Sequence, residues 1–202
     1  MSIWYNRQAY LVTMDIFSHG LWVGAASKAI NKRLKKPFNI RLAVFWGMLP
    51  DLVSFTIPFV WIFWGLIFGG LNLSDLPKPQ EVEPAPHDTL PVFRLTSLLY
   101  NISHSAVMFL IIFGILFLIF KRPFWEMTGW LLHILIDIPT HSYQFYPTPF
   151  LWPLSSWKFN GLPWETPWFL AVNYGAIIIV YFLLHKWNSR KAEKYLTKNK
   201  NL

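Results

Sequence analysis

Hydrophobic residues in this chain form long runs, separated by polar or proline-rich stretches. Four runs reach the ~20 residues that a helix needs to cross a hydrocarbon core about 30 Å thick. They cover Ala9 to Ala29, Leu42 to Leu71, Leu95 to Phe120 and Pro167 to His185. A fifth run, Phe124 to Thr140, is short and contains His and Asp. We count it as a span because the basic residues then fall on one side, so the pattern predicts an all-α, polytopic membrane helical bundle with about five transmembrane helices.

The basic residues set the orientation of this bundle. With the N-terminus outside and the C-terminus inside, 14 of the 18 Lys and Arg residues lie in inside segments. These are Lys28, Lys32, Arg33, Lys35, Lys36, Arg41, Lys121, Arg122, Lys186, Arg190, Lys191, Lys194, Lys198 and Lys200. The remaining four, Arg7, Lys78, Arg94 and Lys158, lie outside. An excess of Lys and Arg in cytoplasmic segments is the usual rule for such proteins.

Two loops are predicted on the outer side. The segment Leu76 to Pro91 is rich in Pro and acidic residues and is typical of an irregular connector. The segment Pro147 to Pro167 contains Trp152, Trp157 and Trp164. Because Trp favours the membrane–water interface, we expect this second loop to lie on the outer headgroup layer.

Composition supports a single integral membrane domain over residues 1–202, with a basic cytoplasmic tail at about 186–202. The chain is 54% hydrophobic and 14% charged, too few charges to cover a soluble domain of 202 residues. It has no cysteine, which excludes disulfides and thiolate metal sites. The net charge of +8 is explained by basic segments beside anionic lipid, so no nucleic-acid partner is expected. The first run lacks a cleavage-site pattern and contains Asp15 and His19, unlike a signal-peptide core.

Seven ionisable residues lie in the middle or outer part of the predicted spans, with Glu126 set aside near the inner end of its span. They are Asp15, His19, Asp51, His104, His133, Asp137 and His141. Each costs about 2.5–3.5 kcal/mol at membrane depth even on the gentler scales, so they need compensation from one another or from an ion. A rise of ~1.5 Å per residue places all seven roughly 13 to 28 Å above the basic helix ends. We therefore expect one polar cluster between the middle and the outer face of the membrane.

Spacing along the helices favours this cluster. Asp15 and His19, like His133 and Asp137, are four residues apart and so share a helix face. Pro139 should kink or end its helix, which would let His141 turn over the same site. By the same reasoning, we expect Pro50 to open the helix beside Asp51.

Imidazole and carboxylate ligands in this pattern suit a divalent first-row ion, most simply zinc, and seven groups could hold one or two ions. An ion with an open coordination position makes a bound water acidic enough to act as a nucleophile near neutral pH. We assign His19, Asp51, His104, His133, Asp137 and His141 as metal ligands. Asp51 and Asp15 are the candidate catalytic residues. Asp15 could be a ligand, a partner that orients His19 or the base for the water.

Several sequence blocks resemble the membrane-bound metal-dependent hydrolase family of bacteria and archaea, a group of small polytopic proteins. The similar blocks are SHGLWVGA at Ser18 to Ala25, GMLPDL at Gly47 to Leu52, SHS at Ser103 to Ser105, GWLLHILID at Gly129 to Asp137 and FLWPLS at Phe150 to Ser155. Carried over by position, the resemblance implies metal-site roles for His19, Asp51, His104, His133 and Asp137.

The chain departs from this family in two places. Leu52, Val53 and Ser54 follow Asp51 where the family often has a second Asp and a His, and Leu99 to Asn101 stand where it often has H-R-G. These departures imply that the chain binds fewer ions than the family does, or that Asp15 and His141 serve as ligands instead. A more distant likeness in H-x-x-x-D spacing links the chain to the zinc-dependent phospholipase C and single-strand nuclease group.

The sequence predicts a metal-dependent hydrolase in the inner (plasma) membrane that acts on a lipid or other interfacial phosphoester. Membrane lipid is the expected partner and substrate source. Two other functions stay open. The same His/Asp cluster could form a proton or ion relay in a transporter, which requires a polar path to both faces. It could also fix helix packing in a non-catalytic membrane scaffold.

Overall fold

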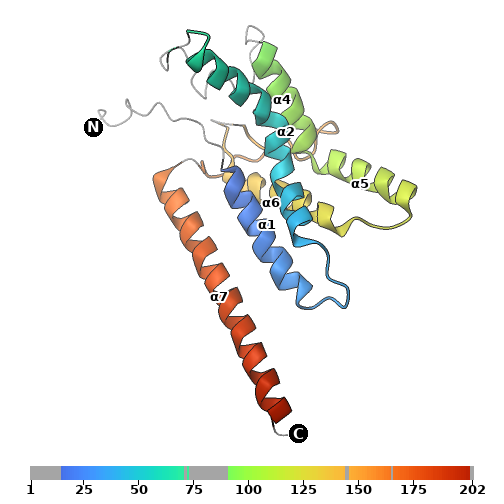
Figure 1. Ribbon diagram of the computed structural model, residues 1–202. Coiled ribbons are helices and arrows are strands. Elements are labelled where there is room, and N and C mark those ends of the chain that lie inside the picture. Colours follow the sequence, from blue (N-terminus) through green and yellow to red (C-terminus); the bar gives the residue numbers. More distant parts are fainter. Residues whose placement is uncertain (1–14, 71, 73–90, 144–145, 165, 201–202) are drawn as a thin grey trace.

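The structure is a computed structural model that describes residues 15–70, 72, 91–143, 146–164 and 166–200. Within these residues the chain is helical and contains no β-strand, which confirms the all-α prediction. The helices, shown in Figure 1, are α1 (Ile16–Asn31), α2 (Ile40–Ile67), α4 (Pro91–Ser103), α5 (Ala106–Phe120), α6 (Thr128–Thr140) and α7 (Pro167–Lys200). A short 3-10 turn, η2 (Trp125–Met127), leads into α6.

Helix α2 is the centre of the fold, because it packs against α1, α4 and α6. Two glycines permit its closest contacts. A Cβ on Gly47 would lie 2.5 Å from Cγ2 of Val23 in α1, and a Cβ on Gly129 in α6 would lie 2.2 Å from the Ala43 carbonyl oxygen. Small residues at such contacts let helix backbones approach closely. Helices α1 and α7 lie alongside each other and run in the same direction (Figure 1).

Polar side chains define where three of the helices begin. The Asp15 carboxylate accepts a hydrogen bond from the Ser18 N–H at the start of α1. Asn39 accepts from the Arg41 and Leu42 N–H groups at the start of α2. Ser105 accepts from the Met108 N–H at the start of α5. Side-chain oxygens at this position satisfy N–H groups that have no partner within the helix.

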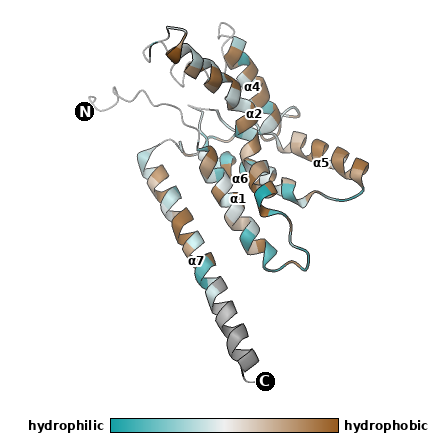
Figure 2. Ribbon diagram, in the orientation of Figure 1, coloured by the Kyte–Doolittle hydropathy of each residue, from teal (hydrophilic) through white to brown (hydrophobic). Residues whose placement is uncertain are grey.

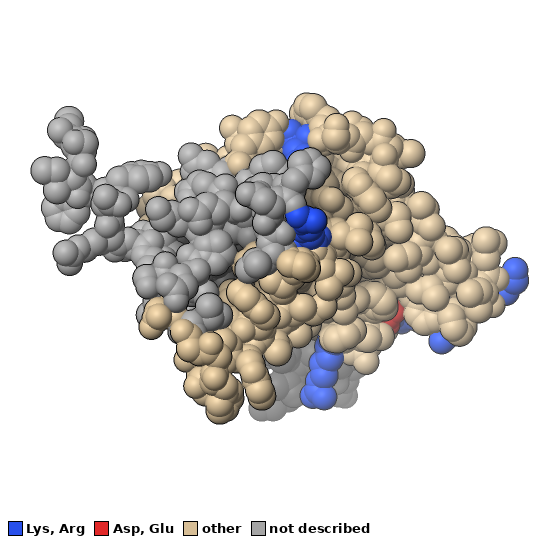
Figure 3. Space-filling model, turned by 90° about the horizontal axis from the view of Figure 1, so that it is seen from above, with Lys and Arg blue, Asp and Glu red and all other residues tan. Residues whose placement is uncertain are grey.

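The predicted membrane character is supported by two or three helices. Helix α2 and the Pro167–Trp187 part of α7 are long and apolar enough to cross a membrane, and the pair α4 and α5 would make a third span. Figure 2 shows apolar colour along α5 and much of the described part of α7. Seen from above in Figure 3, the described surface is mostly uncharged, with a few separate basic groups.

The five-span count remains a prediction. In their described parts α1 has 16 residues and α6 has 13, both shorter than a full span. The predicted first span begins at Ala9, and residues 9–14 lie outside the described part of the chain, as does most of the Pro-rich connector.

One predicted span is broken. We expected a continuous helix over Leu95 to Phe120, but α4 ends at Ser103, α5 begins at Ala106, and the two helices meet at an angle of 63°. The polar residues at the break account for it. His104 turns into the core, and Ser105 caps α5 while its hydroxyl also donates to the Trp152 carbonyl oxygen. The break therefore gives His104 a position at a helix junction.

Pro50 does not open α2 as expected, because the helix continues through both Pro50 and Pro58. The Ser54 hydroxyl donates to the Pro50 carbonyl oxygen at 2.8 Å. Such proline is tolerated inside a helix bundle where side chains satisfy the nearby backbone groups. Asp51 consequently projects from an intact helix.

Candidate metal centre

Six of the seven predicted site residues meet at one point in the interior. His19 comes from α1, Asp51 from α2, and His104 from the break between α4 and α5. His133 and Asp137 come from α6, and His141 is the residue at which α6 ends. All six are buried, the most exposed being His19 at 8%. Four chain segments distant in sequence thus supply one cluster.

The Asp137 carboxylate lies at the middle of this cluster. Its oxygens are 3.0 Å from Nε2 of His133, 3.1 Å from Nε2 of His19, 3.4 Å from Nε2 of His104 and 3.6 Å from Nε2 of His141. Neither oxygen has a partner in hydrogen-bonding geometry. Since a buried carboxylate is costly without compensation, the surrounding imidazoles or an ion must supply positive charge.

A second carboxylate reaches the same imidazoles from α2. Oδ1 of Asp51 lies 3.4 Å from Nε2 of His104 and 3.7 Å from Nε2 of His133. The ring of His19 packs on that of His133, with centroids 3.9 Å apart. Two carboxylates and the rings of three histidines therefore occupy one small volume.

The backbone of α2 sets the orientation of His133. Its Nδ1 lies 2.8 Å from the carbonyl oxygen of Gly47. A carbonyl oxygen only accepts, so Nδ1 is the protonated donor. In neutral His133, Nε2 then presents its lone pair to the cluster, as metal-bound histidines usually do.

A chain of hydroxyl groups orients His104 in the same way. The Ser54 hydroxyl donates to the Pro50 carbonyl, so its oxygen is left to accept from the Ser103 hydroxyl at 2.8 Å. The Ser103 oxygen is then the acceptor for Nδ1 of His104 at 2.9 Å. With Ser54 donating to Pro50 and Ser103 donating to Ser54, Nε2 of neutral His104 also presents a lone pair to the cluster.

These two lone pairs face each other, because the Nε2 atoms of His104 and His133 are 3.0 Å apart. Two nitrogen ligands of one tetrahedral zinc, each about 2.0–2.1 Å from the ion, lie roughly 3.3 Å apart. The observed spacing is close to that value. A shared cation, or a shared proton, would remove the repulsion between the lone pairs.

Two groups of ligand atoms are close enough to hold a metal ion. One is His104, His133 and Asp137, and the other is His19, Asp51 and His133. His133 belongs to both, but its Nδ1 is bonded to Gly47, which leaves Nε2 for a single ion. Two ions would therefore need a bridging carboxylate or His141 to complete the second set. The structure shows that a metal can be held here, and the element and number of ions remain predictions.

Asp15 lies apart from these ligand groups. Its Oδ1 accepts from the Ser18 N–H at 3.1 Å and from the Tyr174 hydroxyl at 2.5 Å, and its Oδ2 accepts from Nδ2 of Asn173 at 3.4 Å. Nδ1 of His19 has no hydrogen-bond partner, so Asp15 does not orient that ring. Among the predicted roles for Asp15, that of a base remains compatible with its position.

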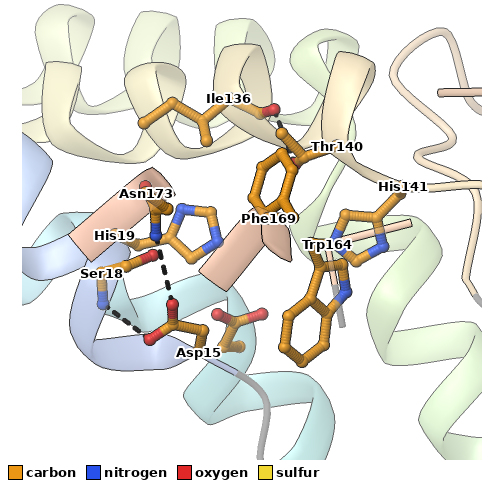
Figure 4. A pocket seen from close by; sticks show the side chains of 10 residues that line it. Asp15, Ser18, His19, Ile136, Thr140, His141, Trp164, Phe169 and Asn173 are labelled. Atoms are coloured by element: carbon orange, nitrogen blue, oxygen red, sulfur yellow. Dashed lines mark hydrogen bonds between the residues drawn. The ribbon is translucent and has the colours of Figure 1, made fainter. Parts of the chain in front are cut away.

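Asp15 nevertheless shares a cavity with the cluster. This cavity, with a volume of about 50 Å³, is lined by Asp15, Ser18, His19, Asp51, Ile136, Thr140, His141, Trp164, Phe169 and Asn173. In Figure 4 the Asp15 carboxylate and the His19 and His141 rings all border the same space. The cavity reaches Asp51 of the cluster, and the apolar rings of Trp164 and Phe169 form part of its wall.

Pro139 allows His141 to join the site, as predicted. Helix α6 ends at Thr140, and the His141 backbone is extended (φ −110, ψ 140), which turns its side chain toward Asp137. The loop that follows is bonded back onto this turn. The Gly161 N–H donates to the His141 carbonyl at 2.7 Å, and the Trp164 N–H donates to that of Thr140 at 3.2 Å. The Trp-rich loop thus covers one side of the site.

Sequence reasoning missed several neutral residues that shape the site. Asn173 and Tyr174 hold Asp15, Ser103 orients His104, and the Tyr100 ring stacks on His104 with centroids 3.8 Å apart. None of these residues is charged at neutral pH, so the cost of burying a charge did not mark them in the sequence. Asn173, a polar residue in an otherwise apolar run, was the signal that could have drawn attention to this part of α7.

The chemistry of this site is inferred from the geometry of the described residues. The described residues form a buried His/Asp cluster that could hold a divalent ion, and the resemblance to membrane-bound metal-dependent hydrolases stays a hypothesis. Comparison of the chain with protein-family models, curated proteins and solved structures gave no match.

Proposed function

We propose that this protein is a membrane-embedded, metal-dependent hydrolase that acts on a lipid or other interfacial phosphoester. One observation carries the proposal. The Nε2 atoms of His104 and His133, each directed by a hydrogen bond at the opposite ring nitrogen, converge on Asp137 and Asp51 in a buried site. A cation held between the two nitrogens would remove the repulsion between their lone pairs.

Zinc is the ion that this donor set fits best, because imidazole and carboxylate ligands suit it and thiolates are absent. When bound with an open position, such an ion supplies Lewis acidity and an acidified water. The cavity beside His19 and His141 is the side from which a water and a substrate could approach.

The remaining residues of the cavity have roles that follow from their contacts. Asp15, held by Tyr174 and Asn173 at the edge of the cavity, is the proposed proton acceptor for the attacking water. Trp164 and Phe169 limit the entry of bulk water. Because the cavity has a volume of only about 50 Å³, it admits a small polar group, such as a phosphoester, and leaves acyl chains outside.

The proposed setting is the inner (plasma) membrane, with five spans, the N-terminus outside and the basic tail inside. Contacts at the basic ends of the helices support this orientation. Lys32, the residue that follows α1, donates to the Leu184 carbonyl of α7 at 3.3 Å. The Asn39 N–H at the start of α2 donates to Glu126, beside α6, at 3.1 Å. The basic end of α1 therefore lies beside that of α7, as the positive-inside rule requires.

Metal analysis of the purified protein tests the proposal directly. We expect stoichiometric zinc or a similar ion in the wild type, loss of it in His133→Ala and Asp137→Ala, and retention in His185→Ala. His185 is an exposed histidine outside the cluster and serves as the matched control. Hydrolysis of phosphoester lipids in mixed micelles should follow the metal content.

Other outcomes of the same experiments would exclude the proposal or favour one of the two alternative functions. A wild-type protein without stoichiometric metal, whose His133→Ala and Asp137→Ala variants keep full activity in the same hydrolase assay, would exclude the proposal. Proton flux in liposomes that is lost in Asp137→Asn would instead support the relay. Variants that only lower stability would support the scaffold.

A further inference from the structure

A second cavity lies between the C-terminal end of α1 and the middle of α7, separate from the His/Asp cluster. It has a volume of about 480 Å³, and its lining includes Lys28, Asn31, Lys32, Tyr181, Leu184 and His185. None of these residues belongs to the metal groups or to the smaller cavity. The proposed hydrolase activity does not use it.

Aromatic rings and one carbonyl hold the two lysines of this cavity in place. Nζ of Lys28 lies 4.7 Å from the centroid of the Tyr181 ring, and Nζ of Lys32 lies 4.4 Å from that of Trp187. Lys32 also donates to the Leu184 carbonyl oxygen. Contact with an aromatic face attracts the ammonium group without neutralising its charge.

No carboxylate neutralises these lysines in the part of the chain that the structure describes. Every ion pair found there joins a histidine of the cluster to Asp51 or Asp137. An ammonium group has three donors. Lys28 and Lys32 therefore keep donors for an anion in a cavity that has apolar walls on its inner side.

The place of the cavity in the fold indicates what kind of anion it meets. The candidate span of α7 covers Pro167–Trp187, and Leu184 and His185 are within its last turn. If this helix crosses the membrane, the cavity opens at the level of the lipid headgroups. Basic pockets between helices on the cytoplasmic side are suited to phosphate-bearing headgroups.

We propose that the cavity between α1 and α7 is a binding site for a phosphate group, with Lys28 and Lys32 as its cationic ligands. The same chemistry could be supplied by an anionic phospholipid of the inner leaflet or by a soluble phosphate. The geometry favours the lipid, because a headgroup would enter from the helix end and its glycerol and acyl carbons would contact Tyr181 and Leu184.

The test compares two double variants of the full chain. Lys28→Ala/Lys32→Ala removes the cavity lysines, whereas Lys35→Ala/Lys36→Ala removes equal charge from the exposed α1–α2 loop outside the cavity. Native mass spectrometry would count phosphatidylglycerol retained after release from nanodiscs, with phosphatidylcholine as the neutral reference. We expect the cavity variant to lose phosphatidylglycerol affinity by roughly tenfold or more. The loop variant should change little.

Two further measurements distinguish loss of binding from misfolding, and a lipid from a soluble phosphate. Lys28→Arg/Lys32→Arg keeps the charge, so recovered binding would show that loss in the alanine variant is not misfolding. Inorganic phosphate added to detergent-solubilised protein distinguishes the sources, because binding of phosphate alone would support a soluble ligand. Equal losses in the cavity and loop variants, or no binding of either probe, would overturn the proposal in favour of diffuse surface charge.

Discussion

Nε2 of His104 and Nε2 of His133 lie 3.0 Å apart in the interior, and Nδ1 of each ring is hydrogen-bonded, to the Ser103 hydroxyl and to the Gly47 carbonyl oxygen respectively. His104 lies at the break between α4 and α5, and His133 lies on α6, 29 residues later in the sequence. Positive charge between the rings, from a bound ion or a shared proton, would stabilise this arrangement.

Zinc should stabilise the protein, because the ligands come from α1, α2, α6 and the α4–α5 break and an ion would link them. After removal of metal with a chelator, zinc at about 100 times its dissociation constant should add about 2.7 kcal/mol to the free energy of unfolding. Thermal melting followed by circular dichroism in detergent would measure the shift. Asp137→Asn should abolish it, and magnesium should produce less, since it prefers oxygen ligands. An equal shift in Asp137→Asn would place the ion elsewhere.

Ser103→Ala should weaken metal binding although serine is not a ligand. The change leaves Nδ1 of His104 without its acceptor, so the ring is no longer held in the required tautomer. We expect a 10–100-fold loss of zinc affinity, typical of groups that orient a ligand, and a loss of about 1–3 kcal/mol in stability. Competition with a chromogenic chelator gives the affinity.

The matched control for Ser103 is Thr56→Ala in α2. Thr56 is exposed, and its hydroxyl donates to the Leu52 carbonyl oxygen and contacts no histidine of the cluster. Thr56→Ala should alter the free energy of unfolding by no more than about 0.5 kcal/mol and leave zinc affinity unaltered. If both variants bind zinc like the wild type, the hydroxyl chain does not set the tautomer of His104.

Gly129→Ala should separate α2 from α6 and disturb the site. The added Cβ would lie 2.2 Å from the Ala43 carbonyl oxygen, a backbone atom that cannot move without shifting α2. We expect destabilisation of about 1–3 kcal/mol and weaker zinc binding, because His133 is bonded to Gly47 across the same contact. Gly114→Ala in α5 is the control, since nothing lies within 4 Å of its added Cβ. Similar stability of the two variants would contradict the close contact.

Tyr174→Phe and Asp15→Asn should reduce hydrolysis while keeping the metal. Asp15 lies outside both ligand groups, so the ion content should match that of the wild type. Loss of a base should lower kcat by about 10²–10⁴-fold in Asp15→Asn, with a smaller loss in Tyr174→Phe. Elemental analysis and kcat measured on the same preparations distinguish loss of the metal from loss of the base.

Tyr181→Phe provides the control for Tyr174→Phe on the same helix. Its hydroxyl donates to the Leu21 carbonyl oxygen at 3.0 Å and does not contact Asp15. Hydrolysis should therefore be unchanged in this variant. Loss of metal in Asp15→Asn would instead identify Asp15 as a ligand, and unchanged activity in that variant would exclude its role as the base.

Much of the candidate site could be predicted from sequence because ionisable residues are conspicuous within long apolar runs. Asp137 and His133 share a helix face by spacing alone, and Pro139 ends α6 so that His141 can turn inward. Depth along each helix also follows from residue counting. These are local properties, governed by helix rise, helix periodicity and the missing N–H of proline.

By itself, then, the sequence determined that the chain is helical and apolar, and which ionisable residues lie at a similar depth. Only the tertiary structure decided that Ser103 and Gly47 direct the two ring nitrogens, that the break at His104 divides α4 from α5, and that Tyr174 holds Asp15 outside the ligand groups. The physical reason is that depth is one coordinate of a residue in a bundle. The rotation of each helix and its distance from the next are set by contacts between segments remote in sequence, such as Gly129 against Ala43.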